Sequence, residues 1–213
     1  MTVNEVLEVA DRLLKPADAL SIERNFPDEP AKPVQPFIEQ TLDVGAPLFM
    51  LGFKETYETP ERPLREQLQT NVCLKCWREY LPLYRRLFDE GLINTQFGAE
   101  YFHGYGYASV LFSGESKDPQ KVAQEIHAEI ERARREGLDK ASFERARRKL
   151  YGRVVMAFND IDELANEMIS AEFRSGGLFD EAELLREITL DEIAQRLETT
   201  LQREYSALSV VKA

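Results

Sequence analysis

Apolar residues recur every three or four positions in several stretches of this chain, the spacing of one buried helix face. The first such stretch runs from Val3 to Leu14, and Asn4 is its expected N-terminal cap. A second stretch covers residues 62–90, where Pro82 breaks or kinks the helix and Gly91 ends it. The first half of the chain is therefore predicted to contain at least two helices.

Three other stretches have the patterns of strands. Residues 47–53 are almost continuously apolar, which is typical of a strand covered on both faces. Residues 94–101 and 105–113 are rich in aromatic residues and flank His103-Gly104, so they predict a hairpin or two adjacent strands. A β-branched segment at residues 205–211 predicts a last strand.

The second half of the chain has mainly helical patterns. Asp118 precedes a proline and Gly137 follows the apolar stripe, which marks both ends of one helix. The stripe at residues 143–168 predicts one long helix or two nearly collinear helices, and a capping pattern begins another helix at Thr189. Helices and strands in this order predict an α+β fold.

Prolines accumulate between residues 15 and 40, at positions 16, 27, 30, 33 and 36. Because proline lacks a backbone donor, such a segment is typical of a connector. We therefore divide the chain into an N-terminal helix with a proline-rich linker, residues 1–40, and a single domain, residues 41–213.

The charge of the chain limits its partners. Its 38 acidic and 27 basic residues give a net charge of -11, which opposes binding to phosphate backbones and anionic membranes. No apolar run approaches the roughly 20 residues that span a bilayer, and the first twenty residues do not have a signal-peptide pattern. We expect a cytoplasmic protein that binds neither nucleic acid nor membrane.

The sequence offers few residues for catalysis or metal binding. Cys73 and Cys76 form a CxxC motif without a second ligand pair, within a predicted helix, so we interpret both as buried core residues. His127 is assigned to a solvated helix face and His103 to a turn. The carboxylates near residue 160 fit the start of a helix. No metal ligands and no catalytic residues are therefore assigned to this chain.

Aromatic residues alternate along the two predicted central strands. Ala108, Val110 and Phe112 form one apolar face, whereas Tyr105 and Tyr107 share the opposite face. The first face is typical of a core. The second face is a candidate surface for an extended peptide, because tyrosine tolerates a partly wet environment.

The order of several segments resembles a known family. These are LYRRLFDEGLIN, the aromatic strands, SGESKDP at residues 113–119, FERARRKLYGRVVMAFND at residues 143–160 and the closing YSALSVVK. Together they resemble the C-terminal half of the pitrilysin, insulinase and mitochondrial-processing-peptidase family, more narrowly its bacterial processing-protease branch. The resemblance implies an α+β half with a mostly antiparallel sheet and flanking helices, facing a homologous half across a closed chamber.

The family carries zinc on a His-x-x-Glu-His motif, which this sequence lacks. The resemblance therefore implies that residues 41–213 are the inactive C-terminal domain. Zinc is then expected in a catalytic half, either in the same parent chain or on a separate subunit. That half and a peptide substrate are the implied partners, and the implied role is a chamber wall without catalysis of its own.

Many relatives hold the substrate with an Arg and a Tyr seven residues apart. In this sequence Leu87 and Asn94 stand at those positions, so the resemblance leaves open that a partner supplies this clamp. Asn94, Phe97 and Tyr101 follow the helix from which relatives reach the substrate and are our candidates for chamber-facing, substrate-binding residues.

Two other functions are compatible with the residues. One is a stand-alone peptide-binding or assembly module that uses the tyrosine face. The other is a hydrolase with a cryptic metal site around His103 and the nearby carboxylates.

Overall fold

The chain folds into eight described helices and five described strands. The computed structural model describes residues 2–15, 17–18, 20–23, 25, 29–56, 62–80, 82–174 and 176–212. The helices are α1 (Val3–Leu13), α2 (Leu64–Tyr80), α3 (Pro82–Asp89), α4 (Pro119–Glu136), α5 (Lys140–Ala157), α6 (Ile161–Phe173), α7 (Asp180–Glu187) and α8 (Leu190–Thr199). The strands are β1 (Phe37–Thr41), β2 (Leu48–Lys54), β3 (Gly98–Gly104), β4 (Tyr107–Glu115) and β5 (Ser206–Lys212).

The strands form one sheet in the order β1-β5-β2-β4-β3. Only β1 and β5 pair in parallel, and the other neighbours are antiparallel. This confirms the predicted α+β fold with a mostly antiparallel sheet. The last strand of the chain, β5, lies inside the sheet between β1 and β2, so the C-terminal segment is needed to complete it.

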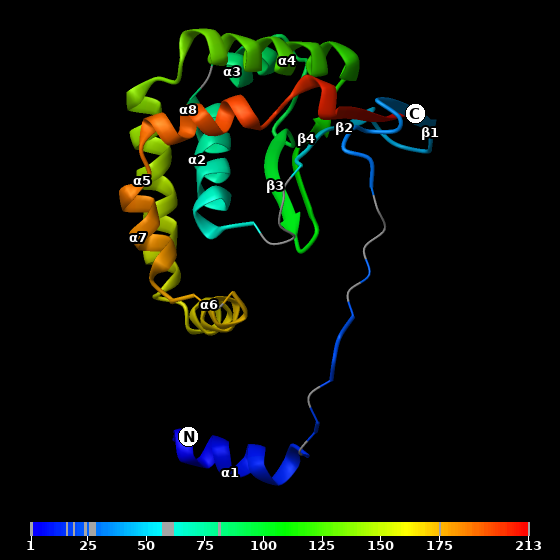
Figure 1. Ribbon diagram of the computed structural model, residues 1–213. Coiled ribbons are helices and arrows are strands. Elements are labelled where there is room, and N and C mark those ends of the chain that lie inside the picture. Colours follow the sequence, from blue (N-terminus) through cyan, green and yellow to red (C-terminus); the bar gives the residue numbers. More distant parts are fainter. Residues whose placement is uncertain are drawn as a thin grey trace.

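Helices pack on one face of this sheet. Helix α2 contacts β3, and α4 contacts β2 and β5, while α5, α7 and α8 surround α2 (Figure 1). The side chains between sheet and helices are fully buried, among them Phe53, Val72, Ile126 and Ile193, each 0% exposed. Burial of this apolar surface is the main force that holds the helices on the sheet.

The predicted hairpin is present, but its turn lies further along the chain than expected. The sequence placed the turn at His103-Gly104, whereas both residues belong to β3. The turn occurs at Tyr105-Gly106, and Gly106 has a φ of 86°. Only glycine adopts such an angle without strain, so Gly106 fixes the turn and the register of β3 on β4.

Two helix boundaries also differ from the predictions. Thr2, not Asn4, caps α1, and it forms a reciprocal capping box with Glu5. The stripe at residues 143–168 forms two helices that are not collinear. Helix α5 ends at Ala157 with Phe158 as its C-cap, and Asp160 then caps α6 through the amides of Asp162 and Glu163. Figure 1 shows α6 turned across the end of α5.

Strand β1 lies within the segment that the sequence suggested as a linker. Phe37 pairs with Leu208 and Thr41 with Lys212, so residues 37–40 belong to the sheet. All five residues of β1 are exposed, which removes the alternation that would have predicted a strand.

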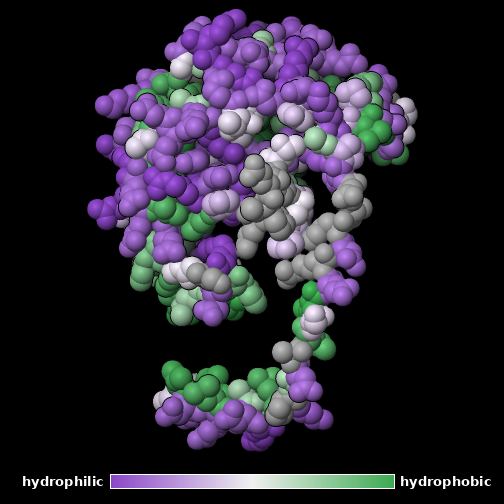
Figure 2. Space-filling view, in the orientation of Figure 1, coloured by the Kyte–Doolittle hydropathy of each residue, from purple (hydrophilic) through white to green (hydrophobic). Residues whose placement is uncertain are grey.

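Helix α1 lies apart from the other elements (Figure 1), and none of its residues is buried. Hydrophobic side chains gather along one side of it (Figure 2). No helix among the described residues combines the length and the apolar composition needed to cross a membrane.

Cys73 and Cys76 are each 2% exposed, which confirms that they are core residues of α2. Replacing Cys73 with Ala is expected to lower the free energy of unfolding by about 1–2 kcal/mol, because it removes packed atoms from the core. Chemical denaturation measures this loss. Cys73→Ser, which buries a polar group at the same site, should lose more. Loss of activity in an assembled peptidase at unchanged stability would instead show that the CxxC motif has a chemical role.

Candidate functional site

The two faces of the sheet differ in what covers them. On the helix-covered face, every other residue of the central strands is buried, namely Phe49, Leu51 and Phe53 of β2, Ala108, Val110 and Phe112 of β4, and Leu208 and Val210 of β5. The alternate residues, which point the other way, are exposed or half-buried. We call this second surface the open face.

The centre of the open face combines the small residues Ser113, Ser209 and Gly52 with the larger Met50 and Leu111. Met50 of β2 lies beside Ser113 of β4 and Ser209 of β5 in the strand register. In the next row, a Cβ atom on Gly52 would lie 3.2 Å from a methyl carbon of Leu111, so glycine lets that leucine lie across the strand. Larger exposed side chains lie toward the ends of the strands, namely Leu48, Phe102 and Tyr107. This arrangement makes a shallow, mixed polar and apolar surface of the kind that accepts a peptide.

Asn94 lies at one end of the open face. Its Nδ2 donates a hydrogen bond to Oε2 of Glu115 over 2.5 Å, and its Oδ1 accepts one from the backbone N–H of Gln96. The alternation along β4 places Glu115 on the same side as Ser113. The structure therefore brings this predicted site residue next to the open face.

Phe97 and Tyr101 point elsewhere. The ring of Phe97 is 4% exposed and packs in the core between Phe49 and Tyr84. The hydroxyl of Tyr101 donates to Oε2 of Glu55 over 3.0 Å, on the helix-covered side. The three residues proposed from the sequence thus do not form one surface. Substrate binding by them stays a prediction, and only Asn94 lies where it could contact a substrate on the open face without rearrangement.

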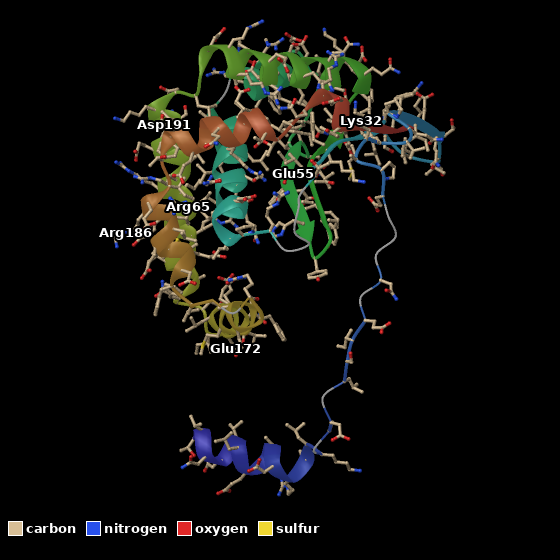
Figure 3. All side chains as sticks on the ribbon, in the orientation of Figure 1. Lys32, Glu55, Arg65, Glu172, Arg186 and Asp191 are labelled. Atoms are coloured by element: carbon tan, nitrogen blue, oxygen red, sulfur yellow. The ribbon has the colours of Figure 1, made fainter. Side chains whose placement is uncertain are left out.

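Glu55 is the centre of a buried polar cluster (Figure 3). Both of its carboxylate oxygens accept from Nη2 of Arg196, at 2.9 and 2.8 Å, and Oε2 also accepts from Arg62 at 3.0 Å. The Nε of Arg196 donates to Oγ1 of Thr70 over 2.9 Å. With Tyr101, the cluster joins the end of β2 to β3, α2 and α8. Sequence reasoning missed it, because Glu55 and Arg196 lie 141 positions apart.

The buried cluster around Glu55 stabilises the fold and is not arranged for a chemical reaction. Its carboxylate is held by two guanidinium groups and a phenol, which leaves the charge neutralised within the protein. Burial, followed by the nearby charge of Glu55, raises the pKa of the Tyr101 hydroxyl above its ordinary value. Tyr101 therefore remains a neutral hydrogen-bond donor, which positions β3 against the helices.

The histidines are both closer to the interior than the sequence suggested. His127, predicted on a solvated helix face, is half-buried, and its ring lies 5.3 Å from that of Phe53. Burial, with a smaller effect of Arg203, lowers the pKa of His127 to about 4. His103 projects from β3 toward Tyr101, 4.6 Å between ring centres, and burial lowers its pKa as well. Both rings are neutral near pH 7.

These residues do not fit a zinc site. His127 is on α4, and His103 is on β3. Within the described parts of the chain, no group of three or more His, Cys, Asp and Glu residues is placed to hold a metal ion. Burial, which is the largest cause, raises the pKa of Cys76 to about 12, so its thiolate is disfavoured. Asp160 caps α6 instead of meeting a histidine. We derive no metal-dependent step in this chain.

A hollow of about 780 Å³ lies between α2, α5 and α6. His103, Arg153, Glu163 and Glu167 are among its lining residues. Glu181 also lines it, and burial, together with the charge of Glu167, raises the pKa of Glu181. Apolar side chains such as Leu68, Val154 and Leu185 also line the hollow, which therefore has a mixed apolar and charged lining.

Comparisons with known proteins agree on one family. The family model for the Peptidase M16 inactive domain matches residues 1–150. The uncharacterized zinc protease YmfH of Bacillus subtilis is 25% identical over 172 residues, which are 79% of this chain and 39% of the relative. The crystal structure of an M16-like peptidase from Alicyclobacillus acidocaldarius has a TM-score of 0.89 at 24% identity and covers 99% of this chain and 51% of its own.

A further solved structure is itself a single domain. It is described as the inactive peptidase domain of a zinc protease from Bordetella parapertussis, with a TM-score of 0.67 at 16% identity, covering 81% of this chain and 93% of its own. By contrast, this chain spans only about two fifths of the curated relative and half of the Alicyclobacillus chain.

Proposed function

This chain belongs to the M16 peptidase family as an inactive domain, and from that premise we propose that it forms one wall of a peptidase chamber opposite a zinc-bearing half. By itself it is not a catalyst. The open face of its sheet is proposed to line the chamber and to contact the peptide substrate, while bond cleavage takes place on the partner.

The open face is the observation that carries this proposal. A sheet with one helix-covered and one open face is stable only if the open face remains wet or meets a partner. Its centre offers the hydroxyls of Ser113 and Ser209 beside the apolar side chain of Met50, which are groups that an extended chain can contact. Asn94 and Glu115 supply hydrogen-bonding groups at one end. The partial coverage of the relatives supports a second segment of comparable size beside this one.

In this proposal the partner supplies zinc, which activates water for attack on a peptide carbonyl. The residues of this chain contribute enclosure and orientation. Confinement of the substrate between two walls raises the probability that its scissile bond reaches the zinc, and it excludes folded proteins that do not fit the chamber.

Peptide turnover is expected only when this chain is combined with a zinc-bearing half, as a mixture or in one polypeptide. Cleavage of an unfolded fluorogenic peptide measures it, and a chelator should abolish it. Ser209→Trp places a bulky ring at the exposed centre of the open face and should lower turnover roughly tenfold, because it displaces the substrate from its productive position.

Thr199→Trp is the matched control, since Thr199 is exposed at the end of α8 on the helix-covered side. It should leave turnover within about twofold of the native value. Asn94→Ala should lower turnover, and Thr95→Ala beside it should not. A zinc-bearing half that is equally active with and without this chain contradicts the chamber-wall proposal. Peptide binding by this chain alone, without stimulation of a zinc half, supports the stand-alone module instead.

A further inference from the structure

Helix α1 has an apolar side that no described part of the chain buries. Val6 is 49% exposed, Val9 43%, Leu13 68% and Leu14 72%, and Figure 2 shows hydrophobic side chains gathered on one side of the helix. Leu20 and Ile22, in the extended segment that follows, are 85% and 73% exposed. Such a stripe normally packs against another surface, because its exposure to water is unfavourable.

The sequence of this N-terminal segment is repeated at the C-terminal end of the chain. Thr-Val-Asn-Glu-Val at residues 2–6 matches Thr-Leu-Asp-Glu-Ile at residues 189–193. In the same register Leu14 matches Leu201. After one additional residue in the second copy, Ala-Leu-Ser-Ile at residues 19–22 matches Ala-Leu-Ser-Val at residues 207–210. The second copy is the unit formed by α8 and β5.

The two copies begin with the same local structure. Thr2 and Thr189 are both N-caps, and each forms a capping box with the glutamate three residues later. A capping box requires two specific residues at a fixed spacing, so its recurrence within matching sequences indicates equivalent helices.

The exposed apolar residues of the first copy match buried residues of the second copy. Ile193 is 0% exposed and Leu201 2%, and their counterparts Val6 and Leu14 are exposed. Leu197 is 2% exposed, and its counterpart Ala10 is half-buried. In the strand, Leu208 is 9% and Val210 2% exposed, and their counterparts are Leu20 and Ile22. The first copy thus has the apolar pattern of a buried helix and strand, but the described part of the chain does not bury it.

We propose that residues 2–22 complete the fold of the homologous zinc-bearing half. There α1 occupies the place that α8 has in this half, and residues 19–22 enter the partner's sheet as β5 enters the sheet here, between two neighbouring strands. This inference rests on the proposed function for the existence of that half. It adds that the two halves share a chain segment and do not merely touch.

The contacts of residues 29–32 agree with the assignment of residues 2–22 to the other half. Lys54 forms a 2.6 Å ion pair with Glu29 and donates to the carbonyl oxygen of Pro30, and Lys32 pairs with Glu204 at 2.6 Å (Lys32 is labelled in Figure 3). Residues 29, 30 and 32 therefore contact this half. We place the boundary between the halves before residue 29, within the predicted segment 1–40.

The partner surface for α1 is expected to be apolar. Val9 stands at the position of Arg196, so α1 lacks the guanidinium that reaches buried Glu55 in this half. The polar side of α1 carries Glu5, Glu8 and Asp11 against a single Arg12, which disfavours an anionic membrane as the alternative occupant.

The test uses the full chain and a zinc-bearing half that ends before its own copy of this helix–strand unit. Leu20→Asp places a carboxylate in the predicted partner core and should weaken association roughly tenfold or more, since burial of an unpaired charge is unfavourable. Ser21→Asp, one residue further on, adds the same charge on the opposite side of the strand and should weaken association less than about twofold. Neither variant should change the unfolding of this half, because residue 20 is exposed here.

Hydrogen exchange gives an independent result. The amides of residues 3–14 and 20–22 should exchange quickly in the chain alone and slowly after the zinc-bearing half is added. If the two halves associate, but both variants weaken association equally and these amides are not protected, the inference of a shared segment is wrong. The chamber proposal then still stands. Absence of any association with the native chain overturns both. Protection by anionic vesicles but not by the zinc-bearing half identifies a membrane anchor and overturns the inference.

Discussion

Replacing Glu55 with Gln is expected to lower the free energy of unfolding by about 3–5 kcal/mol, because it leaves the guanidinium of Arg196 buried without a full counter-charge. The amide keeps the volume of the carboxylate but cannot accept from both guanidinium groups with a negative charge. Equilibrium denaturation in urea measures the loss as a lower midpoint at an unchanged slope.

Glu66→Gln is the matched control for this effect. Glu66 also pairs with Arg62 and Arg196, at 2.8 and 3.7 Å, but its side chain is 38% exposed. Removing that charge should cost at most about 1 kcal/mol, because solvent screens the remaining charges. Adding Arg196→Met to Glu55→Gln should recover part of the loss, since no buried cation then remains. Equal losses for the two glutamate variants would contradict a special role for the buried cluster.

The elements that sequence analysis predicted well are those with a strong local signal. The apolar run before Lys54 became the interior strand β2, although only one of its faces is covered and the predicted coverage of both faces was wrong. The proline and the capping residue at positions 118–119 became the start of α4. Strand β1 had no such signal, because it is exposed and is ordered by parallel pairing with β5 at the other end of the chain. Local sequence patterns do not reveal a pairing between strands that lie so far apart in the sequence.

In the candidate site, too, features with a local sequence signal were predicted and features made by long-range contacts were not. Alternation along residues 107–115 correctly separated the core-facing Val110 from the open-face residues. The Glu55 cluster was not predictable, since its members are distributed over four elements and none has a distinctive spacing. The position of the Phe97 ring in the core was not predictable for a related reason, because sequence proximity to Asn94 does not determine on which side of a loop a ring is buried.

Acidification from pH 6.5 toward pH 4 is expected to destabilise the folded chain through His127. Burial lowers the pKa of His127 in the folded state to about 4, whereas the unfolded side chain titrates at its ordinary value of 6.5. Between these values the unfolded state binds more protons, so the free energy of unfolding falls as the pH falls. Below the folded pKa both states are protonated, and this contribution no longer changes. Its size is about 1–2 kcal/mol, once solvent screening of a half-buried ring is allowed for.

His127→Gln separates this effect from those of other groups. The variant should show a flatter dependence of unfolding free energy on pH between 6.5 and 4, measured by urea denaturation at successive pH values. Part of the slope should remain, because burial also lowers the pKa of His103, and His103→Gln with His127→Gln should remove most of it. At lower pH the native chain and the variants should all lose further unfolding free energy. The reason is that the hydrogen bond from Arg65 holds the pKa of Glu192 in the folded state at about 2, below its ordinary value of 4.5. An unchanged slope in the double variant between pH 6.5 and 4 would show that neither ring is buried in neutral form, and that the packing of α4 on Phe53 does not determine the acid stability of this domain.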